Sequence, residues 1–109
     1  MIEPVIDVLY GDANEEDFEQ LKAGMTPHAL TAFGTNCPPP AWEGEALNSR
    51  RIYIRTSEDR CQPPEIQDMF VKVSGVEWTI EEMRASHGAF FTRPESVGAI
   101  IDKYASMWD

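Results

Sequence analysis

The chain has 109 residues, of which 42% are hydrophobic, and its formal net charge is −10. This length fits one domain with a folded core. The acidity argues against nucleic acid and anionic membranes as partners, because their phosphates attract lysine and arginine. No stretch approaches the roughly 18 apolar residues of a membrane span, and the N-terminus lacks the pattern of a secretory signal. We therefore expect a cytoplasmic protein.

The N-terminal part predicts short helices. Residues 4–10 form an apolar segment whose conformation the pattern leaves open. Asn14 followed by three acidic residues is typical of a helix N-terminus, and apolar side chains then recur at helical spacing, which predicts a helix over about 14–23. The pair Thr26-Pro27 predicts a second helix start, and this helix is expected to stop at Gly34.

The middle of the chain predicts a loop, a strand and a helix. Residues 34–49 are expected to be loop, because prolines 38–40 exclude a helix or a central strand. Residues 51–56 alternate apolar and polar side chains and predict a strand. A helix is expected to open at the proline pair 63–64, run to about Val73 and end before Gly75.

The C-terminal part predicts a second strand and a long helix. Alternation over 76–83 indicates the strand. The tetrad Thr92-Arg-Pro-Glu95 has the pattern of a capping box, and apolar residues then follow helical spacing as far as Trp108. The order strand, helix, strand, helix predicts an α/β fold with parallel strands and covering helices.

Two chemically capable side chains follow the two predicted strands. Asp59 lies three residues past the first strand, and His87 lies just past the second. The carboxyl ends of parallel strands meet at one edge of a sheet, so both side chains can reach the same crevice. An aspartate that accepts a hydrogen bond from one imidazole nitrogen leaves the other free as a base. The simpler alternative is an aspartate in a turn and a histidine that caps the loop before the last helix.

Three stretches resemble a known family: Ile52-Tyr-Ile-Arg-Thr-Ser-Glu-Asp59, Pro63-Pro-Glu-Ile-Gln67, and Ser86-His87 with Phe91 and Arg93-Pro-Glu95. They are similar to the C-terminal third to half of an α/β-hydrolase, in the small-cap branch that includes plant methylesterases, hydroxynitrile lyases and many fungal and bacterial hydrolases. The resemblance implies that residues 1–49 are a cap-like helical segment with a Pro-rich loop. It implies that 50–109 are the strand-helix-strand-helix end of a partial sheet, with Asp59 and His87 as the triad acid and histidine.

The chain departs from that family in several ways. It contains no Gly-x-Ser-x-Gly, the motif that carries the serine nucleophile. By the resemblance, this motif, the oxyanion-hole loop and about five strands would all lie before Met1, which falls in mid-cap. Gly88 stands where hydroxynitrile lyases have a lysine, which argues against cyanohydrin chemistry.

Three functional hypotheses follow. In the first, the chain is a truncated member that carries the Asp59-His87 half of a Ser-His-Asp site for small esters or amides, inactive alone, with its nucleophile supplied by an upstream segment or a companion chain. In the second, it is a non-catalytic module that binds a small apolar ligand or forms a homodimer. In the third, the chain is a small enzyme that uses Cys61 with His87 and Asp59, or only an acid-base pair. Neither Cys37 nor Cys61 has metal-ligand spacing, both are expected to stay reduced, and we expect no metal or other cofactor.

Overall fold

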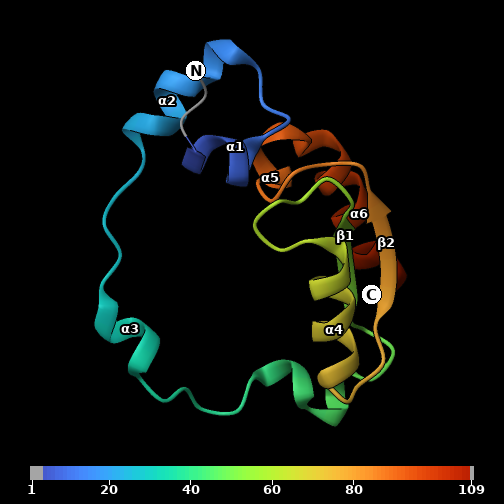
Figure 1. The fold of residues 1–109 in the computed structure, drawn as a ribbon. Helices are drawn as coiled ribbons and strands as arrows, with labels where there is room; N and C mark the ends of the chain where they lie inside the picture. Colours follow the sequence, from blue (N-terminus) through green and yellow to red (C-terminus); the bar gives the residue numbers. More distant parts are fainter. Residues whose placement is uncertain (1–3, 109) are drawn as a thin grey trace.

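The computed structural model describes residues 4–108 and has an α/β fold with a two-stranded parallel sheet. Strand β1 (Ile52–Thr56) pairs with β2 (Thr79–Met83), with Ile52 opposite Thr79 and Thr56 opposite Met83. Helix α4 (Pro64–Val73) connects the strands, and α6 (Pro94–Trp108) follows them (Figure 1). The predicted order strand, helix, strand, helix is confirmed.

Neighbouring residues of β1 face opposite helices, as the alternation of a strand requires. Arg55 bonds to Asp68 of α4 through its Nε, at 2.7 Å from Oδ1. Ile54 instead belongs to the small core beside α6, which contains Met83, Ala85 and Ala89 together with the half-buried Ile54, Val97 and Ile100. The sheet is thus covered by one helix on each face.

Strand β2 is shorter than predicted, because the chain turns before it. Gly75 has a φ of +70° directly after α4. The Ser74 hydroxyl oxygen accepts a hydrogen bond from the indole Nε1 of Trp78 at 2.9 Å. This turn holds residues 74–78 out of the ladder, so the prediction that the strand begins at residue 76 is wrong.

The first three helical elements are α1 (Pro4–Tyr10), η1 (Glu15–Asp17) and α2 (Phe18–Ala23). Helix α1 answers the question that the sequence left open for residues 4–10. The predicted helix over 14–23 is present as a 3-10 turn that continues into α2. Asn14 has the extended backbone of an N-cap, but its side chain makes no cap hydrogen bond.

Helix α3 (Leu30–Gly34) starts later than predicted, with Ala29 in the N-cap position, so the predicted start at Thr26-Pro27 is wrong. Leu30 and Phe33 are 86% and 78% exposed, and without apolar packing so short a segment gains little helical stability. Figure 1 shows the chain between α2 and β1 running wide of the other elements. Before β1 it forms two 3-10 turns, η2 (Ala41–Glu43) and η3 (Glu45–Leu47).

A short helix that the sequence pattern missed, α5 (Ala89–Thr92), precedes α6. The Thr92 hydroxyl donates to Asp12 Oδ2 at 3.1 Å. The predicted capping box at residues 92–95 is therefore not formed in the expected way, because its threonine serves a contact between distant segments. Within residues 4–108, no helix is long and apolar enough to cross a membrane.

Candidate functional site

Backbone pairing continues past the two strands and brings the following loops together. The Ser57 N–H donates to the Met83 carbonyl at 2.9 Å, and the Glu58 N–H donates to the Ala85 carbonyl at 3.1 Å. This pairing places Asp59 beside His87, whose Nδ1 lies 2.9 Å from Asp59 Oδ2 although 28 residues separate the two. The structure thus unites the two side chains that the sequence placed at the strand ends.

Asp59 is buried and fully engaged by hydrogen bonds. Its Oδ1 accepts from the backbone N–H of Cys61 at 2.9 Å and of Gln62 at 2.8 Å. Its Oδ2 accepts from the Thr56 hydroxyl at 2.9 Å as well as from His87. Burial raises the pKa of Asp59, but the Gln62 N–H, His87 and the Thr56 hydroxyl outweigh it, so the pKa lies below its ordinary value. Asp59 is therefore ionised at neutral pH.

The charge on Asp59 fixes which imidazole nitrogen carries the hydrogen. An ionised carboxylate can only accept, so His87 Nδ1 must be the donor in their hydrogen bond. In neutral imidazole Nε2 then has a free lone pair, and the His87 side chain is 40% exposed. This arrangement gives His87 a free basic nitrogen beside an open pocket.

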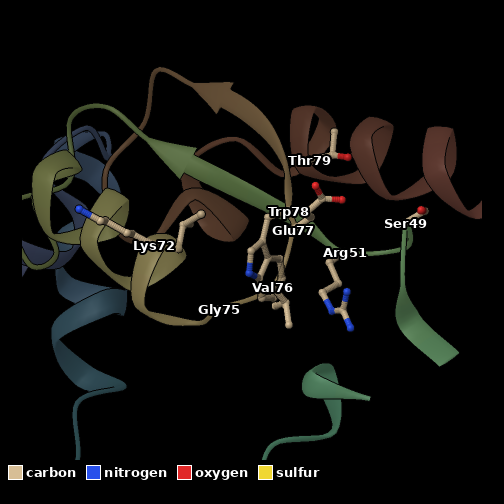
Figure 2. A pocket seen from close by; sticks show the side chains of 9 residues that line it. Ser49, Arg51, Lys72, Gly75, Val76, Glu77, Trp78 and Thr79 are labelled. Carbon is tan, nitrogen blue, oxygen red and sulfur yellow. The ribbon is translucent and has the colours of Figure 1, made fainter. Parts of the chain in front are cut away.

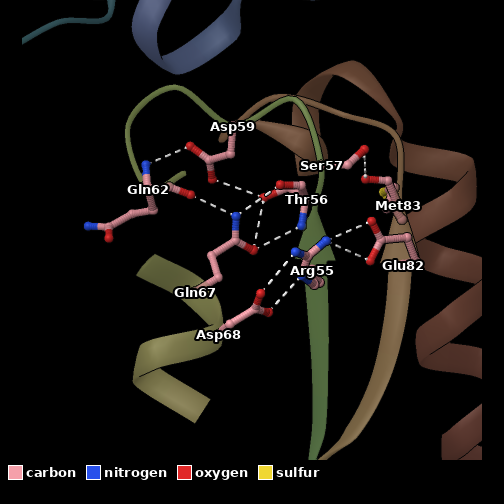
Figure 3. A network of polar contacts seen from close by, with 9 residues as sticks. All are labelled: Arg55, Thr56, Ser57, Asp59, Gln62, Gln67, Asp68, Glu82 and Met83. Atoms are coloured by element: carbon pink, nitrogen blue, oxygen red, sulfur yellow. Dashed lines mark hydrogen bonds and ion pairs between the residues drawn. The ribbon is translucent and has the colours of Figure 1, made fainter. Parts of the chain in front are cut away.

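Gln67 supports the loop that carries Asp59 (Figure 3). It lies in α4 and is only 2% exposed. Its Oε1 accepts from the Thr56 backbone N–H at 2.9 Å, and its Nε2 donates to the carbonyls of Thr56 at 2.9 Å and Gln62 at 2.7 Å. One buried amide therefore joins the end of β1 to the loop that follows Asp59.

An open cavity of about 290 Å³ adjoins the pair. Asp59 and His87 form part of its lining, and most of the remaining wall is apolar or aromatic, including Tyr53, Ile54, Ala89, Phe90 and Val97. Burial and the charges of Asp59 and Asp68 raise the pKa of Tyr53, so its phenol stays protonated at neutral pH. The cavity therefore combines a mostly apolar wall with the polar groups of Asp59 and His87.

A larger cavity of about 640 Å³ lies at the amino ends of the strands, away from this pair (Figure 2). Arg51 lines it but is only 4% exposed. The Arg51 guanidinium donates to the carbonyls of Trp42 at 2.5 Å and Gly44 at 2.9 Å, and to Asn48 Oδ1 at 3.1 Å. These contacts hold the 3-10 turns against the sheet, so Arg51 has a structural role.

The structure locates the other side chains that the sequence raised as candidates. Cys61 is an exposed free thiol whose backbone, not its sulfur, contacts Asp59. Cys37 is also free and exposed. Ser86, the residue before His87, is buried, with 1% of its surface exposed. Within the described part of the chain, no group of three or more metal-ligating side chains is close enough to hold an ion.

Sequence reasoning missed Thr56, Gln67 and Asp12. Gln67 belonged to the stretch that resembles the hydrolase family, but no role was assigned to it. Asp12 contacts Thr92 across 80 residues, and no local pattern indicates such a contact.

Comparisons with known proteins give two distant, partial similarities. The chain is 35% identical over 52 residues to "Putative methylesterase 13, chloroplastic" of Arabidopsis thaliana. The aligned region covers 48% of this chain and 12% of that protein. It is 29% identical over 58 residues to "Putative methylesterase 14, chloroplastic" of the same plant. This aligned region covers 53% of this chain and 17% of that protein. No family model and no solved structure matches. The chain spans less than a fifth of the length of these curated relatives, and the similarities support at most an α/β-hydrolase type of family.

Proposed function

We propose that this chain carries the acid and the histidine of a Ser-His-Asp site that hydrolyses small esters or amides. The observation that carries the proposal is the hydrogen bond of 2.9 Å between His87 Nδ1 and the buried Asp59 carboxylate. In acyl transfer by such a site, the histidine takes the proton of the serine hydroxyl and then gives it to the leaving group. Asp59 orients the ring and stabilises the imidazolium form. The similarity to two plant methylesterases supports an ester as the substrate.

The serine and the oxyanion donors would come from an upstream segment or from a companion chain. No Gly-x-Ser-x-Gly is present in the sequence, and each missing oxyanion donor would remove about 2.7–4 kcal/mol of transition-state stabilisation. Within residues 4–108, the sheet has two strands and β1 pairs on one edge only. Large apolar side chains also stand exposed, among them Phe90 and Ile101, at 66% and 62%. These features fit a chain that completes its sheet with further strands.

An added nucleophile tests the proposal directly. The chain is mixed with ethyl dichloroacetate and increasing methanol, and methyl dichloroacetate is measured. Ethoxide is a poorer leaving group than imidazole, so an imidazole acts on this ester as a general base and not as a nucleophile. If His87 Nε2 acts as a general base, the native chain should catalyse methanolysis about tenfold faster than His87→Ala. This factor is smaller than that of a general base beside a bound nucleophile, because methanol is not held in place. Equal methanolysis by the two proteins would contradict the proposal. His28→Ala is the matched control, because His28 is exposed and outside this cavity.

The source of the nucleophile needs a separate test. The coding sequence upstream of the Met1 codon is read for an in-frame extension that encodes Gly-x-Ser-x-Gly. Such an extension would place the serine in the same polypeptide. An in-frame stop codon without it would shift the search to a companion chain.

The exposed apolar side chains also favour a second candidate, a non-catalytic module that dimerises or binds a small apolar ligand. Light scattering during gel filtration separates the two. A concentration-dependent dimer with no His87-dependent methanolysis would favour the accessory module. A monomer with His87-dependent methanolysis would exclude it.

A further inference from the structure

The segment after α1 lies against the loop that carries His87. The Gly88 N–H donates to the Leu9 carbonyl at 2.7 Å. The Tyr10 ring meets Phe91 edge-on, with centroids 5.9 Å apart, and Phe90 similarly at 6.5 Å. A side chain at Gly88 would overlap the Tyr10 ring, so these two residues are as close as glycine allows. The residue that follows His87 is therefore held by backbone and ring contacts at once.

Asp12 extends this contact to the far end of the same loop. Its side chain is only 9% exposed, and it accepts from the Thr92 hydroxyl at 3.1 Å and pairs with Arg93 at 3.4 Å. Burial raises the pKa of Asp12, but Ser86, Thr92 and Arg93 outweigh it, so the pKa is lowered and the carboxylate is ionised at neutral pH. Asp12 thus contacts Thr92 and Arg93, on the C-terminal side of His87.

The same segment also reaches the loop of the acid. Asp7 of α1 pairs with Arg60, the residue after Asp59. Both side chains of this pair are substantially exposed, so the ion pair itself adds little stability. Its importance is geometric, because residues 7–12 contact both loops that position the Asp59-His87 pair.

We infer that residues 7–12 are a positioning element whose Asp12 and Tyr10 hold the His87 loop so that the imidazole stays against Asp59. The inference deepens the proposed function and rests on it. None of these residues belongs to the lining of the cavity beside His87, so Asp12 is a positioning residue and acts through the loop. Truncating it should loosen the His87-Asp59 hydrogen bond while the protein remains folded.

The test measures the ring hydrogen on His87 Nδ1 by NMR of the folded chain labelled with 15N in histidine. Its exchange with water reports how often the bond to Asp59 opens. Asp12→Ala should speed this exchange roughly fivefold to tenfold, as expected for losing about one hydrogen bond. Thr92→Val should act in the same direction with a smaller effect, since it removes one donor to Asp12 and keeps the side-chain shape.

Glu81→Ala is the matched control. It removes contacts of similar kind, from Lys103 and Tyr104, but at the β2–α6 contact and not at the His87 loop. Faster exchange in Asp12→Ala and Thr92→Val but not in Glu81→Ala supports the positioning role. An unchanged rate in folded Asp12→Ala, or in Thr92→Val if Asp12→Ala does not fold, overturns it. Failure of the proposed function looks different: the native chain would show the same methanolysis as His87→Ala, whatever the exchange rates of the His87 ring hydrogen.

Discussion

The Gln67 side chain pairs with both backbone groups of Thr56, and so takes the place of a neighbouring strand at the end of β1. The Thr56 hydroxyl in turn donates to Asp59 Oδ2. The position of the acid therefore depends on an amide in α4 whose hydrogen bonds go to Thr56 and Gln62. These hydrogen bonds explain why the polar side chain of Gln67 is buried.

Replacing Gln67 by leucine should destabilise the fold. The change leaves the Thr56 N–H and carbonyl buried without their partners, and such unsatisfied groups cost about 1–3 kcal/mol each. We expect a loss of about 2–4 kcal/mol in the free energy of unfolding, measured by urea denaturation. Gln62→Leu is the control, because only the backbone of Gln62 takes part in this network. A Gln67→Leu protein as stable as the native chain would contradict the role assigned to the amide.

Acidification should destabilise the chain through Asp59 and Asp12. Both carboxyls have a folded-state pKa below the ordinary value of 3.8. The unfolded state therefore binds more protons, so the stabilisation is fully present above about pH 5 and is lost as the pH falls through the folded-state values.

Urea denaturation at several pH values, in high salt to screen exposed ion pairs, measures this slope. Asp59→Asn and Asp12→Asn should each flatten it. The result that would count against the assignment is an equally steep slope in the double variant.

Gly88→Ala should be poorly tolerated because the new methyl group overlaps the Tyr10 ring. Overpacking of this kind costs about 1–3 kcal/mol, and we expect a corresponding loss in thermal stability. The double variant with Gly88→Ala and Tyr10→Ala should lose less stability than the sum of the losses in the two single variants. Strict additivity in this double-mutant cycle would show that the two positions do not interact.

Two glycines should respond to alanine in opposite ways. Gly75 has a φ of +70°, so alanine there is strained by about 1–2 kcal/mol although no atom lies within 4 Å of the added methyl group. Gly98 lies within α6 with equally open surroundings, and alanine there should stabilise the helix by about 0.5–1 kcal/mol. Thermal denaturation of both variants compares the two effects. Equal shifts of the same sign would refute the explanation from backbone conformation.

The sequence predicted the elements whose signals are local. Periodicity and a proline pair at residues 63–64 placed β1 and α4 within a residue or two of their observed bounds. The rule that parallel strands end at one edge predicted that Asp59 and His87 would lie together, and they do. Their catalytic role stays a proposal.

Local patterns failed where distant contacts decide the conformation. Thr92 has the pattern of a helix cap, but its hydroxyl donates a hydrogen bond to Asp12. Alternation over residues 76–78 indicated a strand, but Ser74 and Trp78 hold that segment in a turn. Thr26-Pro27 has the pattern of a helix start, but α3 has no apolar packing that would extend it to that point. In each case the competing interaction depends on neighbours that periodicity does not describe.

Acylation of the two histidines by diethyl pyrocarbonate tests most directly whether Asp59 keeps His87 Nε2 free as a base. In Asp59→Asn, the backbone donors at Cys61 and Gln62 should hold the amide oxygen. The amide nitrogen would then donate to His87 Nδ1 and force the hydrogen onto Nε2, the wrong tautomer for a base.

Mass spectrometry gives the rate at His87 relative to the exposed His28, which serves as the internal reference. We predict that Asp59→Asn lowers this ratio by about tenfold or more, since the reagent needs the free lone pair. A ratio unchanged from the native chain would contradict this role, because Asp59 would then not determine which nitrogen of His87 is free.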